Sequence, residues 1–290
     1  MNTASKTPGL PRLSRAGLSP VHQLKVLDHL GKPKQVAIPG ESPLTIKVDG
    51  REIVTLMTLG TNPEELALGY LRNQHLLERI EEVESVLVDW GKETVNVATR
   101  HGQGIPNLEE KLSRVTVTSG CGQGTLFSCT VDKLYERKLP RVRVRQSTIY
   151  ALLKAVAPLN PIYRLAGTVH GCCLCQADRV LMSVEDVGRH NAADTIAGRM
   201  WLDGMDGGDK ILFTTGRLTS EIVMKAAFMG IPVVISKSGV TNMGLELARD
   251  MGMVVIGRAR VTSFLIFNGG EQVEFDAVPK SRPLSGEAQA

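Results

Sequence analysis

The sequence lacks several features that would assign it to a class of protein at once. No apolar run approaches the roughly 18–20 residues of a membrane-spanning helix, the longest being short stretches such as residues 231–235. Residues 1–20 contain no apolar segment of the kind found in secretory signals, so we expect a cytoplasmic protein. Neither sign of charge dominates: 34 Lys and Arg stand against 30 Asp and Glu, a formal net charge of +4. That charge suits contact with anions but is too small for a dedicated nucleic-acid-binding protein, so we expect neither a membrane nor a nucleic acid as partner.

The cysteines are few and odd in number, which argues against a disulfide-stabilised fold. The chain has five cysteines in 290 residues, and three of them lie within residues 172–175. Such crowding is poor material for a framework of structural disulfides. With 42% hydrophobic and 22% charged residues, the chain has the composition of a globular protein and is long enough to bury a core without cross-links. Cysteine reactivity is therefore a better guide to function than cysteine pairing.

Two kinds of hydrophobic period divide the chain. Residues 1–20 and 277–290 have no apolar period and are predicted to be tails. Residues 21–140 contain short runs typical of β-strands, interrupted by one helix that Pro63 starts, and predict a smaller α+β subdomain ending in the loop of Cys121. The expected elements are strands at residues 35–38, 44–48, 52–56, 83–88, 94–97 and 114–117, with the helix at residues 62–77.

Residues 141–276 alternate strands with helices, which is typical of an α/β unit. We expect three layers, with helices on both faces of a mostly parallel sheet. The fold class is therefore α/β, preceded by the smaller α+β subdomain. The expected helices are residues 147–157, 191–200, 220–229 and 243–251, and the expected strands are a segment near Val180 and residues 210–214, 232–236 and 254–256.

Cys121 lies among glycines at positions 120, 122 and 124, directly after a predicted strand. Glycines at this density leave the thiol unshielded, as a nucleophile or a group carrier requires. The alternative is an incidental cysteine in a glycine-rich turn. Five basic residues follow within residues 137–145; they could lower the pKa of a nearby thiol or bind phosphates, or they could be the outward-facing charges of an edge strand.

A second cysteine-rich segment lies further along the chain. Within it, Cys172 and Cys175 form a C-x-x-C pair. Thiolates with an imidazole suit a soft metal such as zinc, and a C-x-x-C pair alone suits redox exchange. A closed zinc site would need a fourth ligand from Cys121, Cys129 or His190. Small thiols packed in a core strand explain the same segment equally well. Its four residues of interest are His170, Cys172, Cys173 and Cys175.

Polar residues also concentrate in residues 185–194, before a predicted helix. Asn191 is a candidate N-cap of that helix. His190 could form an acid/base pair with Glu185 or Asp186. The alternative is a purely structural polar network.

A similar polar loop, residues 214–221, joins a predicted strand to a predicted helix. Arg217, Ser220 and the backbone N–H groups could receive a phosphate at the carboxyl end of the sheet. Neither a P-loop pattern nor a dinucleotide-binding fingerprint is present. Residues 237–242 repeat the arrangement after the next strand, so we expect the two loops to line one crevice.

Three motifs in this half occur in order: Glu185-Asp-Val-Gly-Arg-His-Asn-Ala-Ala-Asp194, Thr215-Gly-Arg217 with Ser220-Glu221, and Lys225-Ala-Ala-x-x-Gly-Ile-Pro232. Together they resemble the FdhD family of formate dehydrogenase accessory proteins over about residues 35–270. The resemblance implies a sulfur carrier that accepts persulfide sulfur from a cysteine desulfurase. It would pass the sulfur to the molybdenum cofactor, in the bis(molybdopterin guanine dinucleotide) form, for formate dehydrogenase. The resemblance also implies a homodimer and a C-terminal half like the cytidine deaminase fold, although the H-x-E and P-C-x-x-C zinc signature of deaminases is absent.

The resemblance also assigns roles to residues. Cys121 matches the first cysteine of the family's C-G-x-C-G loop and is the expected persulfide carrier, whereas Gly124 replaces the second cysteine. That second cysteine is dispensable, or Cys129 or the cluster at residues 172–175 takes its role. His170 and His190 are candidates for proton transfer, and no metal or permanent cofactor is expected. The expected cofactor-binding residues are Arg258, Ala259, Arg260, Val261, Thr262, Ser263, Arg217 and His190.

Two other functions remain compatible with the residues. One is a metal-binding or redox-sensing protein that uses His170, Cys172, Cys173 and Cys175. The other is a chaperone that binds the cofactor without carrying sulfur.

Overall fold

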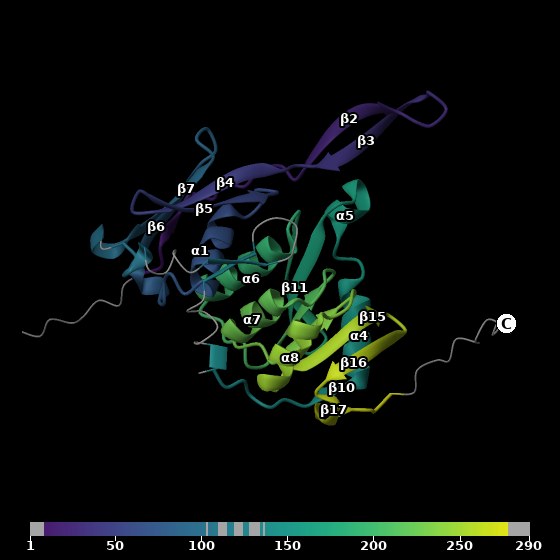
Figure 1. Ribbon diagram of the computed structural model, residues 1–290. Coiled ribbons are helices and arrows are strands. Elements are labelled where there is room, and N and C mark those ends of the chain that lie inside the picture. The colour runs from purple at the N-terminus through teal and green to yellow at the C-terminus, as the bar shows by residue number, and fades with distance from the viewer. Residues whose placement is uncertain are drawn as a thin grey trace, which may run out of the picture.

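The computed structural model describes residues 9–102, 104–109, 115–118, 124–127, 134–135 and 137–277 (Figure 1). Cys121 and Cys129 lie outside these residues. The described residues form a mixed α/β structure with one five-stranded sheet, one six-stranded sheet and three two-stranded ones. No helix in the described part of the chain is long and apolar enough to cross a membrane.

The N-terminal half is built on the five-stranded sheet, in the order β1-β6-β7-β4-β5. Asp49 and Gly50 both have positive φ and join β4 to β5 in a tight hairpin turn, which Asp-Gly favours. Helix α1 (Pro63–Asn73) packs against this sheet, with Pro63 in its first turn as expected, although the Asn62 side chain makes no capping bond. The strands are β1 (Arg12–Leu13), β4 (Ser42–Val48), β5 (Arg51–Thr58), β6 (Val83–Asp89) and β7 (Thr94–Thr99), with 3-10 turns η1 (Ile80–Glu82) and η2 (Arg100–Gly102).

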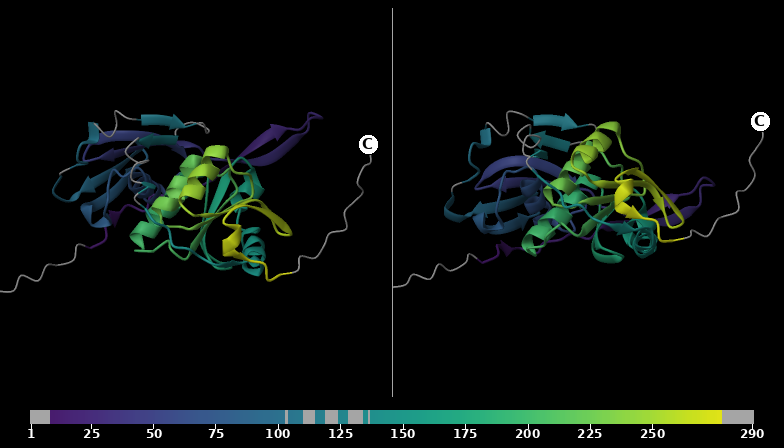
Figure 2. Two further views of the ribbon diagram at one scale, coloured as in Figure 1. Left: turned by 60° about the horizontal axis from the view of Figure 1, so that its bottom comes forward. Right: turned by 90° about the horizontal axis from the view of Figure 1, so that it is seen from below.

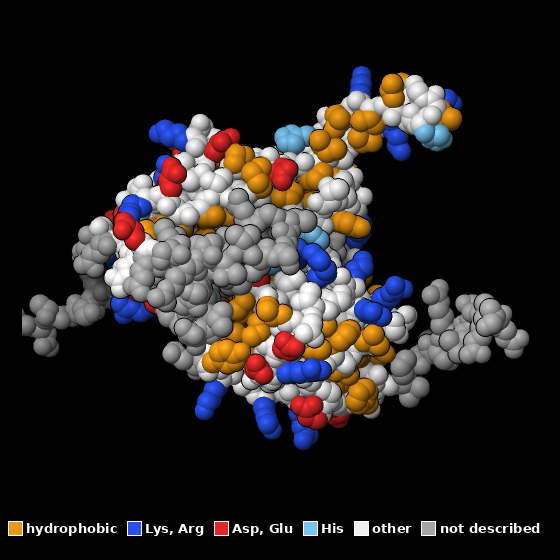
Figure 3. All heavy atoms as spheres, viewed as in Figure 1, with side chains coloured by type: hydrophobic (Ala, Val, Ile, Leu, Met, Phe, Trp, Pro, Cys, Tyr) orange, Lys and Arg blue, Asp and Glu red, His pale blue; other side chains and the backbone are white. Residues whose placement is uncertain are grey.

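Two smaller hairpins complete this half. Strands β2 (Val21–Leu27) and β3 (Pro33–Pro39) form a ribbon that projects from the body and exposes apolar side chains (Figures 1 and 3). The sequence predicted only residues 35–38 of it. Strands β8 (Val115–Thr118) and β9 (Gly124–Phe127) pair with Thr118 opposite Gly124, so Cys121 belongs to their connection.

The C-terminal half is a three-layer unit around the six-stranded sheet, in the order β12-β11-β13-β14-β15-β16. Alternate side chains of the strands pack against α6, α7 and α8 on one face and against α4 on the other, which confirms the three layers. The strands are β11 (His170–Gln176), β12 (Arg179–Asp186), β13 (Lys210–Thr214), β14 (Val233–Ser236), β15 (Val254–Arg260) and β16 (Ser263–Asn268). The helices are α4 (Gln146–Val156), α5 (Pro161–Ala166), α6 (Arg189–Leu202), α7 (Ser220–Phe228) and α8 (Asn242–Asp250); η3 (Gly270–Gln272) and the short pair β10 (Val144–Arg145) and β17 (Val273–Glu274) lie at one end.

The expectation of a mostly parallel sheet is wrong. Only β13–β14 and β14–β15 are parallel, whereas β11 runs antiparallel to both its neighbours and β16 runs antiparallel to β15. Two tight connections cause this, at Ala177–Asp178 and at Val261–Thr262, because a two-residue turn can only join antiparallel strands. The likeness to the cytidine deaminase fold stays a prediction.

A close helix crossing joins the two halves, which lie side by side (Figure 2). Helices α1 and α6 meet at Gly69 and Gly198, where a Cβ on Gly69 would lie 1.7 Å from the carbonyl oxygen of Asp194. A Cβ on Gly198 would lie 1.9 Å from the carbonyl oxygen of Glu65. The backbones are therefore in direct contact, and Arg72 Nη1 donates to the carbonyl oxygen of Ala197 at 3.1 Å. The predicted boundary between the subdomains is therefore bridged by this crossing.

Because the helix backbones touch, adding one methyl group at the crossing is expected to destabilise the fold strongly. Gly69→Ala is expected to lower the free energy of unfolding by about 3 kcal/mol or more, because the added carbon must push two helix backbones apart. Gly270→Ala is the matched control, since nothing lies within 4 Å of a Cβ at that position. Urea unfolding of both variants tests this, and equal midpoints for the two variants would show that the crossing is not tightly packed.

Candidate functional site

One edge of the six-stranded sheet gathers the polar segments that the sequence singled out. The parallel strands β13, β14 and β15 end there, β11 begins there with His170, and β12 ends there with Asp186, which pairs with His170. The loops after β13 and β14 touch, because Lys237 N donates to the Thr214 carbonyl oxygen at 3.0 Å. Thr215 N donates to the carbonyl oxygen of Gly171 at 2.9 Å. The two loops expected to line one crevice therefore do lie together.

Exposed cations line this edge. Arg217 follows β13, Lys237 follows β14, and Arg258 and Arg260 lie at the end of β15, all with exposed side chains. None of the four forms an ion pair in the part of the chain that the structure describes. Arg258 has a φ of +51°, which is unfavourable for a residue with a side chain, and its N–H donates to the carbonyl oxygen of Ser238 at 2.5 Å. The edge therefore offers uncompensated positive charge to an anion.

Two histidines and a buried arginine lie behind these cations. Burial lowers the pKa of His170, and the cations of Arg189 and Arg217 lower it further. The stem of Arg189 packs on Gly216, where a Cβ would lie 2.8 Å from Arg189 Cδ. Only glycine at position 216 lets the loop after β13 close over this arginine.

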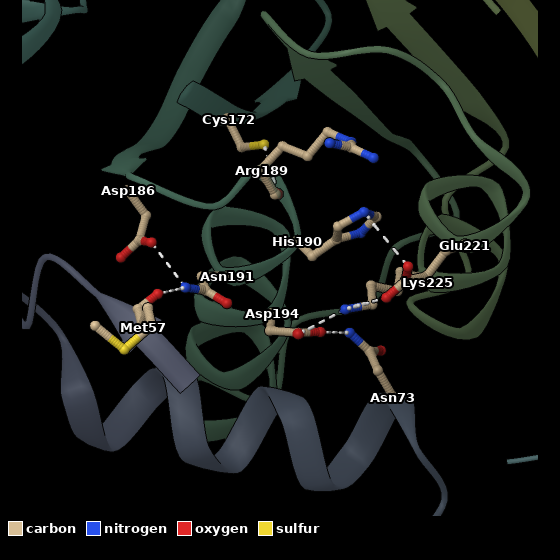
Figure 4. Close-up of polar contacts among 10 residues, drawn as sticks. All are labelled: Met57, Asn73, Cys172, Asp186, Arg189, His190, Asn191, Asp194, Glu221 and Lys225. Carbon is tan, nitrogen blue, oxygen red and sulfur yellow. Dashed lines mark hydrogen bonds and ion pairs between the residues drawn. The ribbon is translucent and has the colours of Figure 1, made fainter. Parts of the chain in front are cut away.

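A chain of buried charges extends from His190 to α1 (Figure 4). His190 Nε2 lies 3.4 Å from Glu221 Oε2, and Lys225 Nζ lies 3.4 Å from Glu221 Oε1. Lys225 Nζ also donates to Asp194 Oδ2 at 2.6 Å, and Asn73 Nδ2 donates to Asp194 Oδ1 at 2.7 Å. Although burial alone would lower the pKa of Lys225, the carboxylates of Asp194 and Glu221 raise it. Lys225 is therefore a permanent buried cation.

His190 is neutral at ordinary pH. Burial lowers its pKa to about 2, with Lys225 and Arg189 among the cations that add to the shift. An imidazole that carries its hydrogen on Nε2, towards Glu221, leaves Nδ1 as an acceptor. In the described residues, Nδ1 has no hydrogen-bond partner although it is buried. His190 Nδ1 can therefore accept a hydrogen bond from a bound group.

The carboxylates close to His190 in the sequence make hydrogen bonds that hold structural elements together rather than pairing with the histidine. Asp186 Oδ2 accepts from Thr58 Oγ1 at 2.6 Å and from Leu59 N at 3.1 Å, which ties β12 to the end of β5. Asn191 is not the N-cap of α6, because the helix begins at Arg189; its Nδ2 donates to Asp186 Oδ1 at 2.8 Å and to the carbonyl oxygen of Met57 at 2.7 Å.

The carboxylate of Glu185 also has a structural role as a hydrogen-bond acceptor. It accepts the backbone N–H groups of Ile162 and Tyr163, at 2.9 Å each, at the start of α5. The structure thus pairs His190 with Glu221 rather than with Glu185 or Asp186. Glu221 lies in a motif that the sequence identified, but no local signal assigned it to His190.

The cysteine cluster is part of the core. Side chains alternate along β11, so Cys172 faces α6, α7 and α8, whereas Cys173 and Cys175 face α4. The C-x-x-C pair therefore points to opposite faces of the sheet and cannot share a metal or a disulfide. Burial raises the pKa of Cys172 to about 12, and its thiol lies 3.3 Å from Thr214 Oγ1. Within the described residues, no group of three His, Cys, Asp or Glu side chains could hold a metal ion. The structure therefore does not assemble the site that a metal-binding or redox-sensing protein would need at these residues. It agrees with the alternative interpretation, in which the cysteines are small side chains packed in a core strand.

The expected cofactor-binding stretch lies at the end of β15 and in the turn to β16. Arg258, Arg260 and the turn residues Val261 and Thr262 are exposed, and Ser263 pairs with Arg260 across the hairpin. Ala259 as a whole residue is only 2% exposed and packs in the core on the α4 side, so it is not accessible to a ligand as its neighbours are. The cofactor-binding roles of these residues stay predictions, as does the carrier role of Cys121.

The buried histidine predicts a pH dependence of stability. The unfolded chain protonates His190 below pH about 6.5, whereas the folded chain does not until about pH 2, so stability falls as the pH drops below 6.5. Between pH 6 and 4, the unfolding free energy of the wild type should decrease by up to about 1.4 kcal/mol per pH unit more than that of His190→Gln. Urea unfolding across this range measures the slopes, with the exposed His29→Gln as the control. A constant difference between the wild type and His190→Gln would contradict a depressed pKa.

Comparison with known proteins agrees with the resemblance. A model of the FdhD/NarQ family matches residues 39–274. The sulfur carrier protein FdhD of Bacillus subtilis (strain 168) is 30% identical over 235 residues, which cover 80% of this chain and 88% of that protein. The sulfur carrier protein FdhD of Staphylococcus aureus (strain MRSA252) is 30% identical over 234 residues, with 80% and 88% covered. The fold is similar, with a TM-score of 0.69 and 25% identity, to a crystal structure described as a formate dehydrogenase accessory protein from Desulfotalea psychrophila, covering 88% of this chain and 98% of that one. The chain belongs to the FdhD/NarQ family.

Proposed function

We propose that this protein is a sulfur carrier for the maturation of formate dehydrogenase. It would accept a persulfide sulfur on Cys121 from a cysteine desulfurase and pass it to the molybdenum cofactor, in the bis(molybdopterin guanine dinucleotide) form. Membership of the FdhD/NarQ family and relatives named sulfur carrier protein support the first half of this proposal. The observation that supports the second half is the row of unpaired cations beside the partly buried His170 and His190 at the sheet edge.

Cys121 is the thiol best suited to carry sulfur. The described cysteines, at positions 172, 173 and 175, are buried, and burial raises their pKa values, so they hold few thiolates at neutral pH. In the loading step, the Cys121 thiolate attacks the terminal sulfur of the desulfurase persulfide. The bond between the two desulfurase sulfurs breaks, and the desulfurase cysteine leaves as a thiolate. The transfer is redox-neutral and requires no second cysteine at position 124.

The sheet edge suits the phosphates of the cofactor, which is the substrate here. Each guanine dinucleotide arm contains a pyrophosphate, whose charges need guanidinium or ammonium partners and backbone N–H groups. Arg217, Lys237 and Arg258 come from three consecutive parallel strands and are not neutralised by carboxylates of the described residues. Arg260 and the turn at Val261–Thr262 extend the same edge outward. We therefore assign cofactor binding to this edge.

His190 would act as a hydrogen-bond acceptor rather than as a partner for phosphate charge. Its imidazole is neutral, so it adds no cation, and its Nδ1 is free to accept. Glu221 fixes the ring through Nε2 at 3.4 Å. Nδ1 could accept a hydrogen bond from a thiol or persulfide S–H at this edge, whereas the low pKa of His190 makes it too weak a base to take that proton at neutral pH.

The partners follow from the same proposal. They are a cysteine desulfurase as donor and formate dehydrogenase as the final recipient of the cofactor. We also propose a homodimer in the cytoplasm, as the family resemblance implies.

Sulfur loading should depend on one residue. After incubation with a cysteine desulfurase and cysteine, and alkylation of the products, mass spectrometry should find one extra sulfur atom on Cys121 in the wild type. Cys121→Ala should lose that sulfur and the ability to support formate dehydrogenase activity, whereas the control Cys129→Ala should keep both. Formate dehydrogenase activity with Cys121→Ala would instead favour a chaperone that binds the cofactor without carrying sulfur, and sulfur on residues 172–175 would move the carrier site to β11.

Binding at the sheet edge can be measured with guanosine diphosphate, which reproduces the guanosine and pyrophosphate part of the cofactor. Arg217→Ala should raise its Kd at least tenfold, because a charge-assisted hydrogen bond contributes about 1.5–3 kcal/mol. Arg179→Ala is the matched control, since Arg179 is equally exposed but begins β12 at the opposite edge. Titration calorimetry that finds the same Kd for the two variants would place the phosphates elsewhere.

A further inference from the structure

A cavity lies at the opposite edge of the six-stranded sheet from the candidate site. Its volume is about 360 Å³, and it lies between the start of α4, the β11–β12 turn and the first residues of β13 and β14. Figure 1 shows α4 and β10 together at this end of the molecule. The lining residues are Val142, Arg143, Val144, Arg145, Thr148, Ala177, Asp209, Lys210, Ile211 and Val233.

This cavity is separate from the candidate site. Strand β13 begins at Lys210 in the cavity and ends at Thr214 beside Arg217, so five residues at about 3.3 Å each put roughly 13 Å or more between them. Strand β14 runs in the same direction from Val233 in the cavity to Ser236, over about 10 Å. The volume lies near the lower end of the about 300–1,000 Å³ range of small-molecule pockets, which is too small for a dinucleotide cofactor.

The floor of the cavity is apolar. Val144, Ile211 and Val233 are buried members of the core between the sheet and α4, and Val142 packs against the same core. They offer a compact hydrocarbon surface to the body of a ligand. A fully hydrated inorganic ion would gain nothing from that surface.

The rim of the cavity is positively charged. It contains Arg143, Arg145 and Lys210 against one carboxylate, Asp209. The Asp209 carboxylate already has two partners: it forms an ion pair with Lys210 and accepts a hydrogen bond from Gln176 Nε2 at 2.5 Å. Arg145 Nε lies 3.5 Å from Glu274 Oε2.

Arg143 has the only guanidinium of the rim without an ion-pair partner among residues the structure describes. It is exposed, so it can turn towards a bound anion without first breaking a salt bridge. The excess of cations in the lining is therefore available to a ligand with a negative head group.

We propose that this cavity binds a small organic anion, with a carboxylate or phosphate head group held by Arg143 and Lys210 and an apolar body resting on Val144, Ile211 and Val233. Head group and body are both needed, because the cations select the charge and the core surface supplies the hydrophobic contact. This binding is independent of sulfur transfer, so the Cys121→Ala variant should bind as the wild type does.

The test uses benzoate and phenyl phosphate as probes, with methyl-labelled Val, Ile and Leu observed by NMR. Both probes should shift the methyl signals of Val144, Ile211 and Val233, and the tighter of the two identifies the head group. Arg143→Ser should raise the Kd at least tenfold. Arg141→Ser, which removes the same charge from the same segment outside the cavity, should leave the Kd unchanged.

Three further measurements can overturn the proposal. Thr148→Phe should fill the cavity and abolish the shifts, whereas shifts that persist in this variant would place the probes elsewhere. Benzyl alcohol, with the body but no charge, and inorganic phosphate, with the charge but no body, should each bind at least tenfold more weakly than the better probe. Equal binding of either one, or no binding of benzoate and phenyl phosphate to the wild type, would show that the cavity is not a site for organic anions.

Discussion

The contact between the backbones of α1 and α6 is the constraint on which the rest of the site depends. Gly69 and Gly198 allow it, and at that distance Asn73 at the end of α1 reaches Asp194 on α6. A second link, from Thr58 and Leu59 to Asp186, fixes the other end of the interface. The residues behind the sheet edge are thus positioned by both halves of the chain.

The buried charges have an electrostatic consequence rather than a purely stabilising one. A buried ion pair such as Lys225 with Asp194 adds little net stability compared with a hydrophobic pair, because both charges lose their hydration. Its cation, however, lies close to His190 and adds to the burial that keeps this imidazole neutral. The result is a neutral hydrogen-bond acceptor directly behind a row of exposed cations, so the phosphates and the hydrogen-bond donors of a ligand can be bound by different residues.

The sequence reveals the parts of this arrangement that are local. The positions of α4, α6, α7, α8 and β13 follow from hydrophobic period, and the polar loops follow from their place after strands. Strand β11 was anticipated only as the alternative explanation of the cysteine segment, because its Gly and Cys residues have no strong β preference and also suggested chemistry. The bond between Asn73 and Asp194 spans 121 residues, and no pattern in either segment points to the other. His190 likewise takes Glu221 rather than its sequence neighbours, because those carboxylates are already saturated by backbone and hydroxyl donors.

The placement of the cysteines also constrains how the proposed carrier would work. The three on β11 are held in the core by the alternation of side chains, so they cannot replace the cysteine that the family has at position 124. Position 124 is glycine and begins β9 opposite Thr118, so the connection that contains Cys121 has a single thiol. A persulfide on that thiol has no neighbour in the connection with which to form a disulfide and expel the sulfur as sulfide. In the proposed mechanism, which does not use Cys129, the sulfur would then stay on Cys121 until an acceptor or an external thiol arrives. Release would thus depend on the cofactor bound at the sheet edge, which is the behaviour that a carrier delivering to one substrate requires.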